Sequence, residues 1–197
     1  MKKLLAALIL IATSVSAQAA DKYVFDKPHT NVIWSANHFG YSEPFGYFTD
    51  IDGSLMIDEK APENSSVTVT IKTDSLQTPV AKFTEHLKTK DFLDVATYPE
   101  AKFVSTKVEL TGNNTAKVSG DLTLHGVTKP LVLDVKLNNI GVHPYTQKHT
   151  VGFAATANLK RSEYGIQFGI PGISDNVRLL IQTEAIREDD NNAKIAK

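Results

Sequence analysis

Residues 116–137 read AKVSGDLTLHGVTKPLVLDVKL, two alternating runs of apolar and polar residues joined by a short turn. Because successive side chains of a strand point to opposite faces, each run predicts a strand with one buried face. Gly126 and the segment Thr128-Lys129-Pro130 have turn chemistry, and Pro130 stands where a strand can begin without losing a ladder bond. The stretch therefore predicts an antiparallel hairpin.

The same alternation recurs along most of the chain. Period-two runs begin near residues 32, 47, 67, 104, 151 and 177, and a shorter apolar stretch covers residues 22–25. With the hairpin these runs make eight substantial strands at the spacing of an all-β protein. An open sheet would leave two exposed edges, and closure removes them. We therefore expect an all-β fold, an eight-stranded antiparallel barrel, with a sandwich as the alternative.

One segment, near residues 79–94, breaks this rhythm and predicts a short helical insert. Thr78 is a candidate cap and Pro79 suits the first helical position. Residues 91–94 are expected to add a second short helical turn. Val80, Phe83 and Leu87 recur at helical spacing. We expect the insert to bury Phe83, Leu87 and Phe92 against one end of the barrel.

Small residues on the inward faces predict that the barrel holds a cavity. They are Ala36, Gly120, Ala155 and Ala157. An eight-stranded barrel is just wide enough for side chains or for one small ligand, so small inward residues leave room for the ligand. A barrel or sandwich filled by its own side chains remains the alternative.

The N-terminus has the features of a cleaved signal peptide at residues 1–19. Lys2 and Lys3 precede an apolar run at residues 4–12, and Ala17-Gln18-Ala19 is a cleavage motif. The run is shorter than the roughly 20 residues of a membrane span, so we expect export without stable membrane insertion. A retained anchor is the alternative. The expected mature chain is one barrel domain at residues 20–188, followed by a polar tail at residues 189–197.

Composition argues against several classes of protein. Without Lys2 and Lys3 the formal net charge falls from −1 to about −3, and both signs are interspersed, whereas nucleic-acid binding needs a clustered basic face. The chain has no cysteine, and its six histidines form no HxH or HExxH motif, so no metal site or cofactor is expected. The common hydrolase and nucleotide-binding motifs are also missing. An enzyme built from scattered residues stays open as an alternative.

Four segments carry a resemblance to a known family. They are HTNVIWSANHFGYSEPFGYF at residues 29–48, HLKTKDFLDVATYPEAKFVS at residues 86–105, GDLTLHGVTKPLVLDV at residues 120–135 and GFAATANLKRSEYGI at residues 152–166. In these segments the chain resembles the YceI family of bacterial periplasmic proteins. The resemblance implies a lipocalin-like barrel with an elongated apolar pore that binds a polyisoprenoid lipid.

The candidate ligand-binding residues follow from the inward faces and the helical insert. We expect Phe83 and Phe92 at the mouth of the pore. The pore wall is expected to contain Trp34, Val118, Leu122, Leu124, Leu133, Val135, Phe153 and Ala155. Each of these residues could equally be ordinary core.

Arg161 is the most informative polar residue, because it stands where a strand ends and a glycine-rich loop begins. One hypothesis is that its guanidinium holds a phosphate or quinone head group at the pore entrance. The alternative is that it pairs with Glu163, Asp91 or Asp94 and fixes the loop on the barrel.

The leading functional hypothesis is a periplasmic, non-enzymatic protein that holds a polyisoprenoid or quinone-type lipid in its pore. The alternatives are a ligand-free structural or stress-related periplasmic protein, and an enzyme acting on a lipid. The sequence does not determine the oligomeric state, and a homodimer is one alternative.

Overall fold

The structure is a computed structural model of the chain, and it describes residues 20–192. The predicted signal peptide at residues 1–19 and the last five residues of the predicted tail lie outside this range. Within residues 20–192, no helix is both long and apolar enough to cross a membrane.

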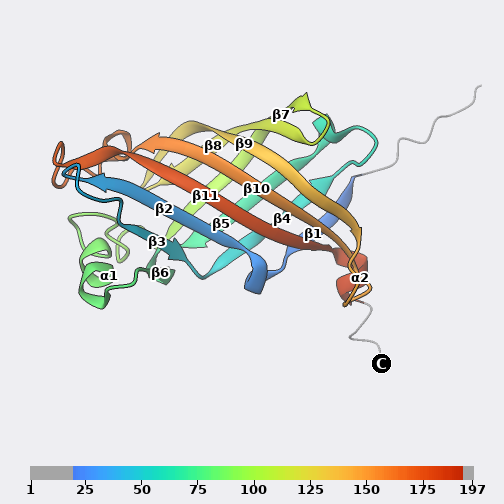
Figure 1. Cartoon of the computed structure of the whole chain (residues 1–197), viewed down its shortest axis with the longest axis horizontal. Coiled ribbons are helices and arrows are strands. Elements are labelled where there is room, and N and C mark those ends of the chain that lie inside the picture. The colour runs from blue at the N-terminus through green and yellow to red at the C-terminus, as the bar shows by residue number, and fades with distance from the viewer. Residues whose placement is uncertain (1–19, 193–197) are drawn as a thin grey trace, which may run out of the picture.

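The described chain forms one antiparallel sheet that closes on itself, because β1 pairs with both β4 and β11 (Figure 1). The closed order is β1-β4-β5-β7-β8-β9-β10-β11, and β2, β3 and β6 continue from β11. The strands are β1 (Asp21–Phe25), β2 (Asn31–His38), β3 (Phe45–Phe48), β4 (Ile51–Ile57), β5 (Ser66–Lys72), β6 (Leu76–Gln77), β7 (Glu100–Gly112), β8 (Thr115–Leu124), β9 (Val127–Val142), β10 (His149–Lys160) and β11 (Ile173–Arg187).

The eleven segments combine into eight long strands, because three of the eight are interrupted. The short 3-10 helix η1 (Lys27–His29) separates β1 from β2, and both lie along β11. In the same way β3 and β4 are consecutive parts of one strand, and β5 and β6 are separated only by η3 (Thr73–Ser75). The predicted closed barrel of eight antiparallel strands is confirmed, and the apolar stretch at residues 22–25 belongs to the same strand as β2.

The hairpin of β8 and β9 has a tighter turn than the sequence suggests. Only His125 and Gly126 connect the strands, with φ of 51° and 75°, as the two-residue hairpin turn with positive φ at both positions requires. A Cβ at residue 126 would lie 2.6 Å from the ring of Tyr98, so this position needs glycine. The prediction that Thr128-Lys129-Pro130 belongs to the turn is wrong. Pro130 pairs with Asp121 on β8, where β9 has no partner on β10, so its missing N–H breaks no ladder bond.

The helical insert is shorter than predicted. Helix α1 (Ala81–Leu87) begins after Val80, which makes no side-chain capping bond, so Thr78 and Pro79 precede the helix. The Thr78 hydroxyl instead forms a hydrogen bond of 2.9 Å with the Thr84 hydroxyl. Residues 91–93 form a non-helical turn, and Asp94 has a φ of 42°. The predicted second helical turn is therefore wrong.

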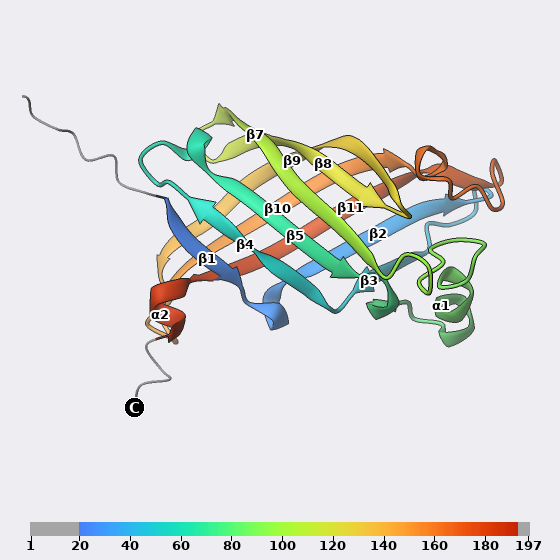
Figure 2. The same ribbon diagram turned by 180° about the vertical axis from the view of Figure 1, so that it is seen from behind.

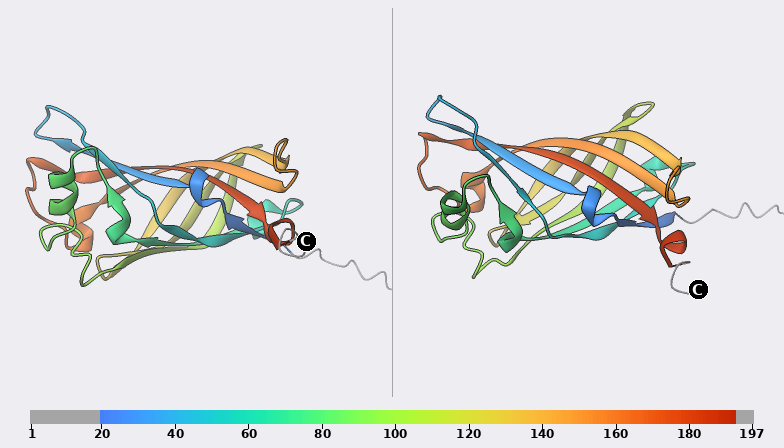
Figure 3. Two further views of the ribbon diagram at one scale, coloured as in Figure 1. Left: turned by 90° about the horizontal axis from the view of Figure 1, so that it is seen from below. Right: turned by 60° about the horizontal axis from the view of Figure 1, so that its bottom comes forward.

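The two helices lie at opposite ends of the long barrel, as all views agree (Figures 1, 2 and 3). Helix α2 (Glu188–Asn192) includes the first residues of the predicted polar tail. It is attached to the barrel, since the Asp190 carboxylate accepts the backbone N–H of His149 at 2.9 Å. Besides the central core, separate buried clusters occupy the α1 end and the α2 end, the latter around the fully buried Tyr23.

Candidate ligand-binding cavity

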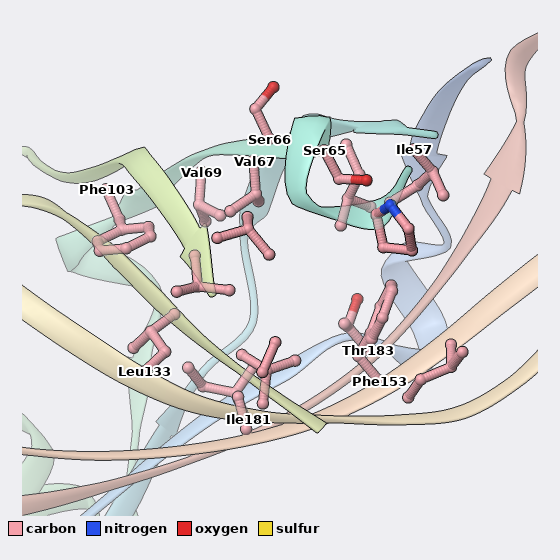
Figure 4. A pocket seen from close by; sticks show the side chains of 18 of the residues that line it. Ile57, Ser65, Ser66, Val67, Val69, Phe103, Leu133, Phe153, Ile181 and Thr183 are labelled. Atoms are coloured by element: carbon pink, nitrogen blue, oxygen red, sulfur yellow. The ribbon is translucent and has the colours of Figure 1, made fainter. Parts of the chain in front are cut away.

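A cavity of about 340 Å³ lies inside the barrel, within the range of small-molecule sites. All eight long strands contribute apolar side chains to its wall, because the inward-facing residues of each strand are apolar. Figure 4 shows Val67 and Val69 pointing across the cavity toward Leu133 and Ile181 on the opposite wall. The interior is therefore lined mainly by aliphatic and aromatic side chains.

Six of the predicted site residues line this cavity, four of them from the β8–β9 hairpin. In both strands of the hairpin the alternating apolar side chains face inward, as expected. The six residues are Val118, Leu122, Leu133, Val135, Phe153 and Ala155.

Four other predicted site residues do not line the cavity. Trp34, Phe83, Phe92 and Leu124 belong to the cluster at the α1 end, around buried Leu76, Leu87 and Ile166. The rings of Trp34 and Phe83 meet edge to face at 6.2 Å, and Phe92 is only 8% exposed. The structure therefore places Phe83 and Phe92 in a seal at this end, and the expectation that they stand at the mouth of the cavity is wrong.

Apart from Thr30 and Thr183, the polar part of the lining is at the other end of the barrel. It comes from the β4–β5 and β7–β8 connections and the first residues of the strands that follow, all remote from α1 in Figure 1. These residues are Asp58, Glu59, Ser65, Ser66, Asn113, Asn114 and Thr115. Sequence reasoning missed this rim, because polar turn residues occur at every connection and nothing local shows which connections face the cavity.

The rim carries negative charge. Among the described residues that line the cavity, Asp58 and Glu59 are the charged ones, and none is a lysine, arginine or histidine. The Asp58 carboxylate accepts the N–H groups of Ala61 and Lys60, each at 2.9 Å, and these bonds hold its pKa below the usual value. A carboxylate that stays ionised at the rim disfavours an anionic ligand group there.

Arg161 is buried away from the cavity, in the short helix η4 (Arg161–Tyr164) that follows β10. Its guanidinium donates to three backbone carbonyls, those of Ser174 at 2.9 Å, Ile166 at 3.1 Å and Ile173 at 2.9 Å. Burial lowers the pKa of Arg161, and nearby Asp175 opposes that shift.

Arg161 therefore fixes the loop at residues 161–174 on the barrel, which agrees with the structural alternative. The partners differ from those expected, however, because they are the carbonyl of Ile166 in the loop and those of Ile173 and Ser174 at the start of β11, rather than Glu163, Asp91 or Asp94. The structure does not bring Arg161 to the cavity, so it provides no head-group contact there.

The small inward residues differ in what fills the space beside them. Ala155 lines the cavity, as expected. At Gly120 the Phe103 ring already occupies the space, 2.4 Å from where a Cβ would lie. Ala36 and Ala157 are buried outside the cavity lining. A small residue leaves room only where no neighbouring strand supplies a large one, and strand register decides that.

A family model described as a YceI-like domain matches residues 23–185. The chain belongs to the YceI-like family. A UPF0312 protein of Pseudomonas savastanoi pv. phaseolicola is 45% identical over 193 residues, covering 95% of this chain and 99% of that protein.

Solved structures of other proteins share the fold. The crystal structure of BcnA from Burkholderia cenocepacia has a TM-score of 0.74 at 22% identity, covering 81% of this chain and 98% of BcnA. A polyisoprenoid-binding domain from Saccharophagus degradans, implicated in plant cell wall breakdown, has a TM-score of 0.66 at 15% identity, covering 84% of this chain and 98% of that domain. At such identities the likeness supports the YceI-like barrel as the fold.

Proposed function

We propose that this protein is a non-enzymatic periplasmic carrier that holds a long isoprenoid lipid in the barrel cavity. The observation that carries the proposal is an apolar cavity with a sealed α1 end and a polar rim at the other end. This arrangement suits an amphiphile whose chain lies inside while its head remains at the rim. The polyisoprenoid-binding domain with the same fold supports the choice of lipid.

The dimensions of the barrel favour a chain over a compact metabolite. Strand β9 has 16 residues, which at about 3.4 Å each and a tilt of about 40° give a barrel roughly 40 Å long. Ligands of moderate size retain about 0.3 kcal/mol per heavy atom. Twenty enclosed atoms therefore give about 6 kcal/mol, a dissociation constant of tens of micromolar, without any charged contact.

The rim favours a neutral head group, such as an alcohol or a quinone, over a phosphate. The described cavity lining offers hydroxyl and amide groups together with two carboxylates and no cation. Location in the periplasm rests on the signal-peptide features of residues 1–19.

The test replaces a small residue of the cavity wall with a large one. Ala155→Phe places a large ring in the cavity, whereas Ala154→Phe changes the next residue, whose side chain points to the outer face, and serves as the matched control. The probe is geranylgeraniol, with binding measured by calorimetry on the mature protein. We expect Ala155→Phe to weaken binding at least tenfold and the control to leave it within twofold.

Two outcomes would contradict the proposal. If neither geranylgeraniol nor lipid extracted from the host binds the unmodified protein, the ligand-free structural alternative is favoured. If geranylgeranyl diphosphate binds more tightly than the alcohol, the neutral head group is wrong while the carrier function stands.

A further inference from the structure

A group of metal-ligating side chains lies outside the cavity, on the outer wall of the barrel. One donor atom each from Asp26, His29 and Glu184 lie within 4.8 Å of one another. Asp26 directly precedes η1 and His29 is its last residue, while Glu184 belongs to β11 near the end of the chain. Because Thr183 lines the cavity, its neighbour Glu184 points to the opposite, outer face.

The backbone holds these three residues together independently of their own side chains. The N–H of Asp26 donates to the carbonyl of Glu184 at 2.9 Å, which joins the start of η1 to β11. Buried Thr30 reinforces this junction, since its hydroxyl donates to the Asp26 carbonyl at 3.0 Å and contacts the Thr183 hydroxyl at 2.9 Å. The arrangement is thus set by the fold, as a preformed binding site requires.

We propose that Asp26, His29 and Glu184 bind a divalent first-row transition-metal ion, of the class of Zn²⁺. Without metal, Nδ1 of His29 and Oδ2 of Asp26 share a hydrogen bond of 2.8 Å, and the metal ion replaces the proton between them. One imidazole nitrogen with two carboxylate oxygens is a mixed donor set that suits zinc and its neighbours. Ca²⁺ and Mg²⁺ prefer oxygen ligands alone.

A separate hollow of about 220 Å³ adjoins this group and provides space for the remaining ligands. His29 and Glu184 both line it, together with Asn138, Asn139 and Gln182, and it shares Phe153 and Thr183 with the lining of the cavity. Water molecules in the hollow complete the coordination shell and hydrogen-bond to the asparagine and glutamine side chains there.

The charges around His29 favour a cation, and hydrogen bonds distinguish His29 from the second histidine that lines the hollow. The carboxylates of Asp26 and Glu184 lie beside the ring of His29, so the group presents negative charge that attracts a cation. His143 lines the same hollow, but its Nδ1 accepts the N–H groups of Tyr145 and Thr146, each at 3.2 Å. Its Nε2 therefore carries the proton in the neutral ring and has no lone pair for the metal.

The test is calorimetric titration of the mature protein with Zn²⁺ alone at neutral pH. We expect one ion per chain, with His29→Ala and the near-isosteric Glu184→Gln each weakening binding at least tenfold. The matched control is His38→Ala, which removes another exposed histidine, at the end of β2. Circular dichroism checks that each variant is folded, and His29, being exposed, should not be needed for folding.

A second measurement uses the melting temperature, because an ion that binds only the folded state raises it. Excess Zn²⁺ should raise the melting temperature of the unmodified protein and of His38→Ala, and leave His29→Ala unchanged. The proposal is overturned if the unmodified protein binds no Zn²⁺, if His29→Ala and His38→Ala bind it equally, or if Mg²⁺ binds as tightly as Zn²⁺.

Discussion

The two ends of the barrel differ in the residues that cover them. At the α1 end, apolar side chains from the helix and its loops fill the opening, and Arg161 bonds the loop that follows β10 to the start of β11. At the other end the connections are polar and the cavity reaches the rim. A closed barrel therefore does not decide by itself where a ligand enters. The composition of the loops at each end decides it.

The largest expected effect comes from removing the guanidinium at the sealed end. Arg161→Met removes the donor from one buried and two partly buried carbonyls, and a buried unpaired acceptor costs roughly 1–3 kcal/mol, so we expect a loss of about 4 kcal/mol in the free energy of unfolding. Urea denaturation measures this loss. The neighbouring exposed residue gives the control, and Lys160→Met should change stability by less than about 0.5 kcal/mol.

The Arg161→Met variant also distinguishes a role in holding the loop from a role in ligand binding. Because Arg161 does not line the cavity, the folded variant should bind geranylgeraniol with unchanged affinity. If the folded variant binds geranylgeraniol tenfold more weakly, Arg161 takes part in ligand binding and the structural role alone is wrong.

A smaller effect tests the contrast between the ends with apolar residues. Phe92 is 8% exposed within the α1-end cluster, and Phe92→Ala should cost about 3 kcal/mol through the cavity it leaves. Leu110, at the open end, is 53% exposed, and Leu110→Ala should cost less than about 0.5 kcal/mol. Thermal or urea unfolding measures both losses, and equal losses would contradict the assignment of a sealed and an open end.

The smallest effect concerns the carboxylate beside the Arg161 loop. Asp175 accepts the N–H and the hydroxyl of Ser162, both at 2.8 Å, and the backbone bond holds its pKa below the usual 3.8. Because the folded-state pKa is the lower one, its contribution is complete above 3.8 and is lost as the pH falls through the folded-state value.

We therefore expect Asp175→Asn to cost about 1 kcal/mol at pH 7 and less at about pH 2.5. Urea denaturation of both proteins at the two pH values measures the difference. A cost that stays the same at both pH values would show that the carboxylate charge is not responsible.

Much of the fold could be predicted from local pattern. The alternation in residues 116–137 correctly identified the inward face of the hairpin, since Val118, Leu122, Leu133 and Val135 all line the cavity. The eight strands and the helical insert were predicted for the same reason. Strand periodicity and helix periodicity are properties of neighbouring residues, so a single sequence contains them.

The details of turns were less predictable. His125 and Gly126 form the whole hairpin turn because the strands stay paired up to Leu124 and Val127. Pro130 has turn chemistry by composition, yet it lies in a strand because its other neighbour, β10, is unpaired there. Proline disfavours a strand only because it lacks an N–H donor. Where no neighbouring strand would accept that N–H, as at Pro130, the pairing of the strands decides the local structure.

By itself the sequence determined the all-β class and the apolar face of each strand, because these depend on short-range alternation. It favoured a closed barrel over a sandwich, and the pairing of β1 with β11 in the tertiary structure decided between them. Only the tertiary structure decided which end is open, that Phe103 fills the space beside Gly120, and that Arg161 bonds to carbonyls. It also brought Glu184 beside Asp26 and His29. These outcomes depend on the register between strands far apart in the chain, and no local pattern of residues encodes that register.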